Sequence, residues 1–426
     1  MRGALLVSLV GLVAALLAVG GVGAQGGIEV RESASQSDFP HGIVFTLDAA
    51  SDVALDEVRL IYEIAPDGVR ASAIPDCVGG TVISCTFQLG ASRRALLIPG
   101  AEVTYFWRLT KGDVSQETAS QVVVYEDDRF DWRMVSDGNL TLWWYSGSEE
   151  EARAVLAAGR ESLDGLSRLL QTSVDFPVKI FYYASAREME PAIIADNVEG
   201  VVTLGEVVYS DTAMVSADAA ALEIARHEVA HIVVRQAVPG PFGIPDWLNE
   251  GTAVFAQTQP LENQLQALEG AIRSGRVFSV RSLSSASTGA LGDRVSLFYG
   301  QSWSLVDFLV NTYGEEKFTQ LFQAFEEGAT TAEALEQVYG FNQDGLENAW
   351  RDSVGLPPRQ APTPGGNQEQ APPTEAGPTP EAAESEPGAE DGGGVPLGVI
   401  LVIVGLTALL AGGLVGAGVF LARRYR

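Results

Sequence analysis

The stretch His227-Glu228-Val229-Ala230-His231 indicates the fold of the central part of this chain, and Glu250 completes its pattern. The chain has three histidines, and two of them lie in this pentapeptide. Helix positions four apart share a face, so both imidazoles can bind one metal ion while Glu228 points beside it, toward a metal-bound water. Two histidines and a glutamate, which follows after 18 further residues, make the ligand set of a catalytic zinc with one position open. We therefore expect a Zn²⁺ site and, with it, a zinc-dependent peptidase that hydrolyses peptide bonds.

Other residues near this pattern are candidates for the remaining chemistry. Glu228 is the candidate general base, and Tyr299 is the candidate donor to the oxyanion. Tyr299 is flanked by apolar residues, so a packed core tyrosine is an equally good interpretation. Asp246 and Asn249 precede Glu250 and are candidate partners that orient the metal ligands. Asp246 is also a candidate helix N-cap.

A helix over residues 218–237 is expected to carry both histidines, and Pro239-Gly240 ends it. The histidines lie nearly opposite the apolar stripe of this helix. One face is therefore expected to pack on the core, while the other faces a cleft. The stripe consists of Leu222, Ala225, Val229 and Val233.

Strands are expected before this helix and mainly helices after it, which makes an α+β domain. An antiparallel edge strand beside the metal would let a peptide substrate pair as an added strand. Ser148 and Glu151 indicate a capping box at the start of the first helix. The expected strands are 143–145, 178–183 and a pair within 200–215, and the expected later helices are 261–274, 300–311, 315–327, 331–339 and 343–354.

His227-Glu-Val-Ala-His231 followed by Trp247-Leu-Asn-Glu-Gly251 resembles the gluzincin metallopeptidases, and within them the bacterial peptidase MA-like domain proteins. The resemblance covers roughly residues 131–356. It implies a zincin-like fold, zinc bound by His227, His231 and Glu250, and Glu228 as the general base. Gluzincin aminopeptidases also carry a Gly-rich motif ahead of the HExxH sequence, which residues 217–226 lack. An endopeptidase is therefore slightly favoured over an aminopeptidase.

Residues 25–126 are expected to form an all-β sandwich of the fibronectin or immunoglobulin kind. Short runs of β-branched and aromatic residues alternate there with turn-like segments. Both cysteines of the chain, Cys77 and Cys85, lie in this region. Two closely spaced cysteines in an exported chain favour a disulfide, with two buried thiols as the alternative. The expected strands are 42–47, 58–62, 82–89, 103–109 and 121–125.

Apolar runs lie near both ends of the chain. Residues 1–24 combine Arg2, an apolar run and small residues before a cleavage site, which is typical of a secretory signal, with a membrane anchor as the alternative. Residues 395–422 carry no charge and are long enough to form a single transmembrane helix. Arginines follow in the tail 423–426, which the positive-inside rule places in the cytoplasm. We therefore expect a single-pass protein of the cell membrane, with its N-terminal domains outside.

Residues 357–394 are rich in Pro, Glu, Gly and Ala, and are expected to be a disordered linker between a peptidase domain at 127–356 and the membrane. The net charge of −28 argues against a nucleic-acid partner, because phosphates bind clustered Lys and Arg. The expected partners are peptide or protein substrates and the membrane. The alternative function is a non-catalytic, zinc-containing cell-surface binding or scaffold protein. Glu228 argues against it, because a purely structural zinc site needs no such carboxylate.

Overall fold

The computed structural model describes residues 27–65, 69–90, 97–193, 201–203, 205–209, 211–239, 243–285, 291–359 and 400–402. These residues belong to two compact units, Met1–Asp131 and Trp132–Arg426. The expected signal sequence lies outside the described residues, as does the expected transmembrane segment apart from Ile400–Val402, which form a short strand. Among the helices of the described residues, none is long and apolar enough to cross a membrane.

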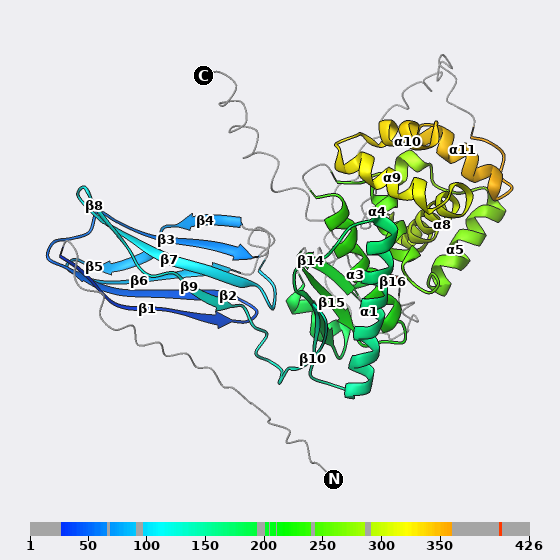
Figure 1. Ribbon diagram of the computed structural model, residues 1–426. Helices are drawn as coiled ribbons and strands as arrows, with labels where there is room; N and C mark the ends of the chain where they lie inside the picture. Colours follow the sequence, from blue (N-terminus) through cyan, green and yellow to red (C-terminus); the bar gives the residue numbers. More distant parts are fainter. Residues whose placement is uncertain are drawn as a thin grey trace, which may run out of the picture. The chain divides into compact units, whose positions relative to one another are not determined.

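The first unit consists of two antiparallel β-sheets that pack face to face (Figure 1). One sheet has the strand order β1-β2-β6-β5, and the other has the order β4-β3-β7-β8, with β9 also paired to β7. Phe45 of one sheet and Tyr105 of the other pack together, with ring centroids 4.7 Å apart. The expectation of a β-rich N-terminal region is therefore confirmed. The strands are β1 (Ile28–Asp38), β2 (Gly42–Ser51), β3 (Glu57–Ala65), β4 (Val69–Ala73), β5 (Asp76–Gly79), β6 (Val82–Gly90), β7 (Glu102–Lys111), β8 (Val114–Glu117) and β9 (Gln121–Val124).

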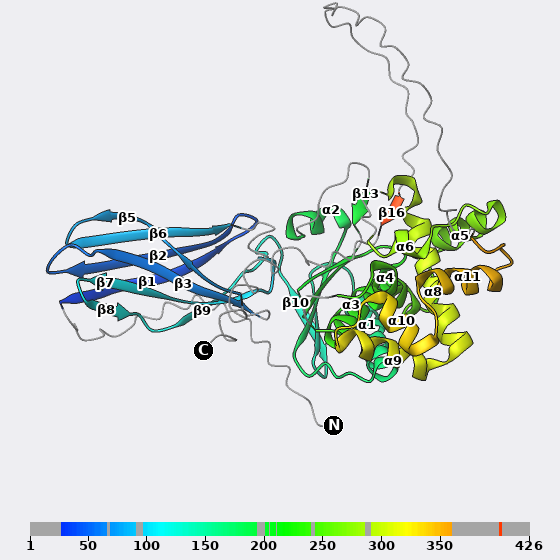
Figure 2. The same cartoon turned by 90° about the horizontal axis from the view of Figure 1, so that it is seen from above.

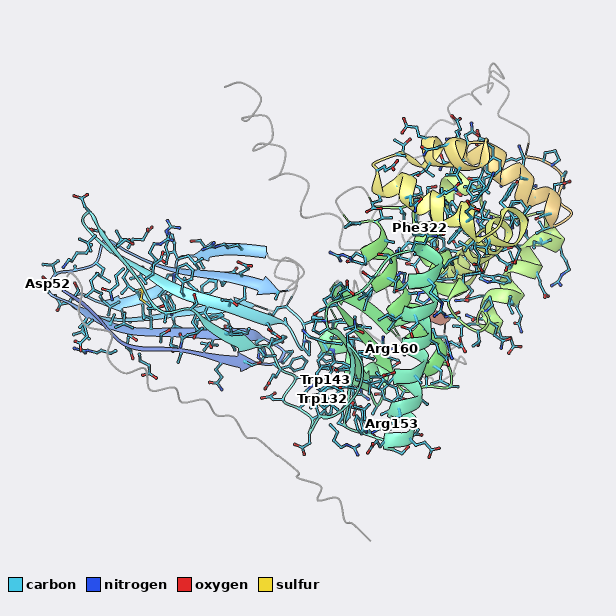
Figure 3. The ribbon with its side chains drawn as sticks, in the orientation of Figure 1. Asp52, Trp132, Trp143, Arg153, Arg160 and Phe322 are labelled. Carbon is cyan, nitrogen blue, oxygen red and sulfur yellow. A yellow bond between two sulfur atoms is a disulfide. The ribbon has the colours of Figure 1, made fainter. Side chains whose placement is uncertain are left out.

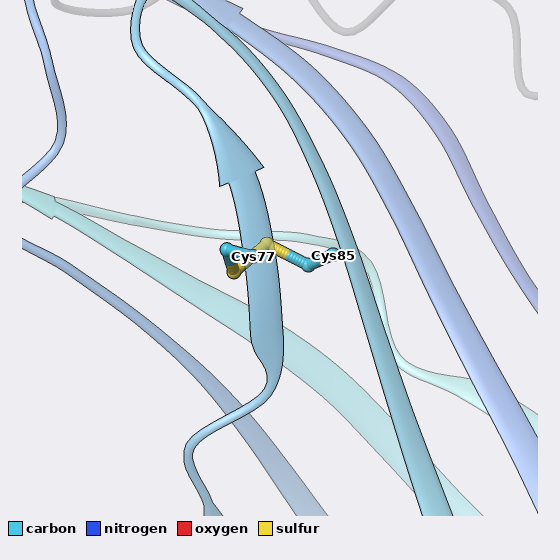
Figure 4. The surroundings of a disulfide bond; sticks show 2 residues. All are labelled: Cys77 and Cys85. Atoms are coloured by element: carbon cyan, nitrogen blue, oxygen red, sulfur yellow. A yellow bond between two sulfur atoms is a disulfide. The ribbon is translucent and has the colours of Figure 1, made fainter.

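Alternation of apolar and polar residues explains why these segments form strands of a two-layer structure. In β2, Phe45 and Leu47 are fully buried, whereas the intervening Thr46 is exposed, as expected for a strand with one face on the core. At one edge, Cys77 of β5 lies directly opposite Cys85 of β6, and the two sulfur atoms are bonded at 2.02 Å (Figure 4). The disulfide closes a short hairpin within the first unit.

The second unit is built on a five-stranded mixed sheet with the order β10-β11-β12-β15-β14. The two outer pairs are antiparallel and the inner pairs are parallel. Helix α1 connects the parallel neighbours β11 and β12, and begins with a capping box formed by Ser148 and Glu151, as the sequence predicts. The elements are β10 (Arg133–Asp137), β11 (Leu140–Trp144), α1 (Glu149–Leu170), β12 (Val178–Tyr183), α2 (Ala186–Met189), η1 (Glu190–Ala192), β14 (Gly205–Tyr209) and β15 (Thr212–Ser216); a further strand, β13 (Val201–Thr203), pairs with β16 (Ile400–Val402).

One face of this sheet is covered by α1 and by α3 (Ala221–Ala237) (Figure 2). Gly159 of α1 is in the contact: a Cβ atom there would lie 2.9 Å from Ile180 of the sheet and 3.3 Å from Val229 of α3. On the other face, Trp143 stacks on Phe181 at 5.2 Å, and Trp132 meets the same phenylalanine edge-on at 5.5 Å. Both tryptophans are labelled in Figure 3. The sheet thus has an aliphatic face that packs on the helices and an aromatic face.

Helices follow α3, and they fix the position of the long helix α8 (Val295–Tyr313). A Cβ atom on Gly251 would lie 2.4 Å from the backbone oxygen of Ser302, and one on Gly300 would lie 2.5 Å from that of Gln264. The absence of a side chain at both positions therefore lets α8 approach its neighbours closely. The other elements are α4 (Asp246–Phe255), α5 (Glu262–Ser274), α6 (Val280–Leu283), η2 (Gly292–Arg294), α9 (Glu315–Glu326), α10 (Thr331–Tyr339) and α11 (Gln343–Ser353).

The chain after α11 is held against the helical part of the second unit. Arg351 donates to the carbonyl of Pro357 at 2.7 Å, and Arg359 forms an ion pair with the buried Glu347. Glu347 also accepts the backbone N–H of Val280 at 3.2 Å. Contacts with the folded unit therefore continue to Arg359, into the first residues of the expected linker.

Candidate metal centre

Two helices, α3 and α4, bring the predicted ligands together from distant parts of the sequence. His227 and His231 lie one turn apart on α3, and Glu250 lies on α4. Helix α4 is held in the core by the fully buried side chains of Trp247 and Leu248, which precede Glu250 in the chain. The apolar part of the WLNEG sequence thus anchors the helix, and its polar part faces α3.

The three ligand atoms form a small triangle. The Nε2 atoms of His227 and His231 are 3.2 Å apart, and the Oε2 atom of Glu250 lies 3.3 Å from the first and 3.4 Å from the second. Ligands about 2.0–2.1 Å from a tetrahedral zinc ion lie about 3.3–3.4 Å from each other. The triangle therefore has the dimensions of one face of a zinc coordination tetrahedron, and its donor set suits that ion.

Asn249 defines which nitrogen of His231 is available to a metal. Its Oδ1 atom lies 3.0 Å from the Nδ1 atom of His231. A carbonyl oxygen only accepts, so the proton sits on Nδ1, and the lone pair of Nε2 points into the triangle. The structure thus brings Asn249 into contact with one of the predicted ligands.

Burial and mutual charge separate the pKa values of the three ligands. Burial lowers the pKa of His227 to about 4. Burial also disfavours a charge on His231, but the attraction and hydrogen bonding of Glu250 outweigh it and raise the pKa of His231. The same contacts with the histidines overcome burial and lower the pKa of Glu250. Burial and mutual attraction therefore shift the pKa of His231 upward and the pKa values of His227 and Glu250 downward, and any proton held on a ligand nitrogen competes with a bound cation.

The centre is almost closed, which differs from the expected arrangement of a core face and a cleft face. His227 and Glu228 have no exposed surface, and His231 and Glu250 are 6% and 5% exposed. Leu222, assigned to the core stripe, is instead 41% exposed. The reason is that α3 is surrounded by α1, the sheet and α4, so that almost all of its faces are buried.

The other predicted residues lie at different distances from this triangle. The ring of Tyr299 meets the ring of His227 edge-on, with centroids 6.0 Å apart, and is 1% exposed. Glu228 is fully buried next to His227 on α3. Asp246 is the first residue of α4 rather than its N-cap, which is Pro245. Burial, followed by the negative charge of Glu250, raises the pKa of Asp246 to about 7.

Gly251 also belongs to the centre, because it lets α8 pack closely against α4, and it was not among the residues predicted for the site. The backbone of α8 lies against it, and the same helix carries Tyr299 to His227. The signal available in the sequence is that this glycine directly follows Glu250, a predicted ligand, within a segment that forms a helix.

A separate surface cavity of about 400 Å³, lined by residues such as Ser162, Leu166 and Phe255, contains none of the predicted site residues.

Among known proteins, a family model matches part of the second unit. No curated protein matches the chain. Two solved structures show a weak likeness to this chain. A bromine derivative of BhCBM56 has 10% sequence identity and a TM-score of 0.17, and the match covers 25% of this chain and 99% of that one. A family 64 laminaripentaose-producing β-1,3-glucanase from Paenibacillus barengoltzii has 19% identity and a TM-score of 0.15, and the match covers 26% of each chain. These scores carry no conclusion about the fold. Residues 158–355 match the family model described as Peptidase MA superfamily, which supports a zincin-like, metallopeptidase-like domain in this part of the chain.

Proposed function

We propose that the chain is a zinc-dependent peptidase of the gluzincin type, an endopeptidase rather than an aminopeptidase. The observation that carries the proposal is the triangle of His227, His231 and Glu250, with edges of 3.2–3.4 Å. These residues would hold the ion, which would supply Lewis acidity and a bound water of lowered pKa. The family match over residues 158–355 supports the same class of reaction.

The residues of the chain divide the remaining work. Glu228 follows His227 directly on α3 and is the proposed general base, which would take a proton from the attacking water and pass it to the leaving amine. Burying a carboxylate is unfavourable, so its position inside the domain argues for a chemical role. Tyr299 lies against His227 and is the proposed donor to the oxyanion. Asn249 keeps His231 in the tautomer that binds the metal.

The proposed location is the outer face of a cell membrane. The supporting features are the signal-like residues 1–24 and the uncharged segment 395–422, followed by arginines. In spheroplasts of a bacterial host that expresses the full chain, added protease should degrade the N-terminal units and leave a short membrane-bound C-terminal fragment. Release of the whole chain by alkaline extraction would rule out the membrane anchor.

The activity is tested with the full-length protein in detergent and its Glu228→Gln variant. Each is incubated with a diverse peptide mixture, and the products are identified by mass spectrometry, while bound zinc is measured separately. We expect internal cleavage by the wild type, a loss of at least about 10²-fold in rate in the variant, and equal zinc content, because general bases contribute 10²–10⁴-fold. Zinc in both proteins without cleavage by either would favour the alternative of a non-catalytic binding or scaffold protein.

A further inference from the structure

Helices α3 and α4 touch at a second place besides the metal centre. Glu223, His227 and His231 are spaced four residues apart and therefore lie on one face of α3. The histidines meet Glu250 within α4, whereas Glu223 meets Thr258, which lies just beyond the end of that helix. The two helices thus run antiparallel and are joined at two places along the same face.

The second contact is made almost entirely by one residue of α3. The carboxylate of Glu223 accepts the backbone N–H of Thr258 at 2.8 Å and the hydroxyl of the same residue at 2.5 Å. The backbone carbonyl of Glu223 accepts the side-chain amide of Gln257 at 3.3 Å, and Gln257 is 6% exposed. Glu223 therefore holds the turn after α4 with both its side chain and its main chain.

A guanidinium group supports this carboxylate. Arg226 donates to Glu223 at 3.2 Å and to Glu161 of α1 at 2.6 Å. The side chain of Arg226 is 12% exposed, whereas that of Glu161 is 65% exposed. Among the described residues, Glu161 has no hydrogen bond or ion pair with α4, so it shares the arginine of α3 with Glu223 but not the connection between α3 and the turn after α4.

We propose that Glu223 is a positioning residue of the metal centre. By holding the turn after α4, it keeps that helix in place along α3 and so keeps Glu250 opposite His227 and His231. The beginning of α4 is anchored by the buried Trp247 and Leu248 but lacks a side-chain cap, and Glu223 adds a polar connection at the other end of the helix. The inference rests on metal binding by this centre, which is part of the proposed function.

The test measures zinc affinity, by competition with a chromogenic chelator, for the full-length protein in detergent. Partners that orient a metal ligand typically contribute 10–100-fold to affinity, and Glu223 acts one step further away. We therefore expect Glu223→Ala to bind zinc about tenfold more weakly than the wild type. The absorption spectrum of bound Co²⁺ should also change, because the ligand geometry changes. Equal zinc affinity in Glu223→Ala and the wild type would overturn the proposal.

Four further variants separate positioning from charge and from folding. Glu161→Ala removes a carboxylate from the same arginine and should leave zinc affinity unchanged. Thr258→Val removes the hydroxyl donor without altering charge, and should weaken binding by a few fold, while Thr258→Ser should restore it. The double variant Glu223→Ala with Thr258→Val should lose little more than Glu223→Ala alone, because both changes remove one contact. Equal losses in Glu161→Ala and Glu223→Ala would show a general charge effect and overturn the positioning role.

Failure of the inference and failure of the proposed function give different results. Zinc binding that depends on Glu223, without any peptide cleavage by the wild type, would retain the positioning role and remove the peptidase. Cleavage by the wild type together with unaltered zinc affinity in Glu223→Ala would do the reverse. Circular dichroism of each metal-free variant identifies a misfolded protein, and the milder Thr258→Val and Thr258→Ser pair then decides the question.

Discussion

At the scale of single residues, the environment of each imidazole determines its role. Asn249 accepts a hydrogen bond from Nδ1 of His231, which leaves Nε2 for the metal. We expect Asn249→Leu, which has a similar volume and no acceptor, to weaken zinc binding by about tenfold. Asn249→Asp keeps the acceptor and should bind zinc at least as tightly as the wild type. Chelator competition at neutral pH measures both, and an unchanged affinity in Asn249→Leu would show that the contact does not matter for the metal.

Asp246 should make the stability of the metal-free protein depend on pH. Its pKa is raised to about 7 by burial and by the charge of Glu250. Between about pH 4 and pH 7 the folded state therefore keeps a proton that the unfolded chain has released. The contribution of this carboxyl to the free energy of unfolding consequently falls as the pH rises through that window, and is constant above it. His227, whose pKa is lowered to about 4, contributes in the opposite direction over a similar range.

The Asp246→Asn variant isolates the contribution of the carboxyl, since His227 is present in both proteins. We expect the free energy of unfolding of the variant, minus that of the wild type, to increase from pH 4 to pH 7 and then to level off. Because Asp246 is only partly buried, solvent screening limits the increase to about 1 kcal/mol. Urea denaturation in the presence of EDTA at several pH values gives this difference, and a constant difference across the range would contradict the assigned pKa.

Much of the centre followed from residue identity and spacing, because a metal site requires particular donors at fixed separations. The positions four apart on a helix predicted that His227 and His231 share a face, and the structure places them together with Glu250. The closure of the site did not follow from the sequence. A helical wheel shows which residues share a face, but it does not show how many neighbours surround the helix, and α3 is surrounded on nearly every side.

At the scale of elements, two glycines of the helical part offer a matched test of packing. A Cβ atom on Gly251 would lie 2.4 Å from the backbone oxygen of Ser302, whereas one on Gly270 of α5 would meet nothing within 4 Å. We expect Gly251→Ala to lower the free energy of unfolding by about 1–3 kcal/mol through overpacking and to weaken zinc binding, because α4 carries Glu250. Gly270→Ala should instead raise stability by about 0.5–1 kcal/mol. Thermal and urea unfolding distinguish the two, and a neutral Gly251→Ala would show that α8 shifts at no cost.

Elements with a strong local pattern were predicted closely, and those formed by tertiary packing were not. The strand 178–183 and the helix 331–339 have the predicted bounds. Strand β10 (Arg133–Asp137) was missed, because it lies at an edge and only Val135 is buried in it. Helix α8 was expected to begin at Gly300 but begins at Val295. The glycine resembles a helix boundary in sequence, although its actual role is a close approach to α5.

At the scale of the whole molecule, each of the two units has a core of its own. The first has buried residues from both of its sheets, such as Phe45 and Trp107, and the second has a continuous cluster that includes Val229 and Trp247. Each also has its own cross-link: the Cys77–Cys85 disulfide in the first and the proposed zinc ion in the second. Units with cores of their own commonly unfold as separate cooperative blocks.

Selective removal of the two cross-links should therefore act on different unfolding transitions. In calorimetry of the full-length protein, we expect EDTA to lower only the transition of the zinc-binding unit, by roughly 5–10 °C, which corresponds to about 3 kcal/mol of lost binding energy when free zinc exceeds its Kd a hundredfold. A reducing agent should lower only the transition of the first unit. Closing a loop of this length contributes about 2.5 kcal/mol, or roughly 10–20 °C for a unit of this size. If EDTA and the reducing agent each shifted both transitions together, the two units would form one cooperative structure, and the metal centre would then be coupled to the stability of the β-sheets that precede it.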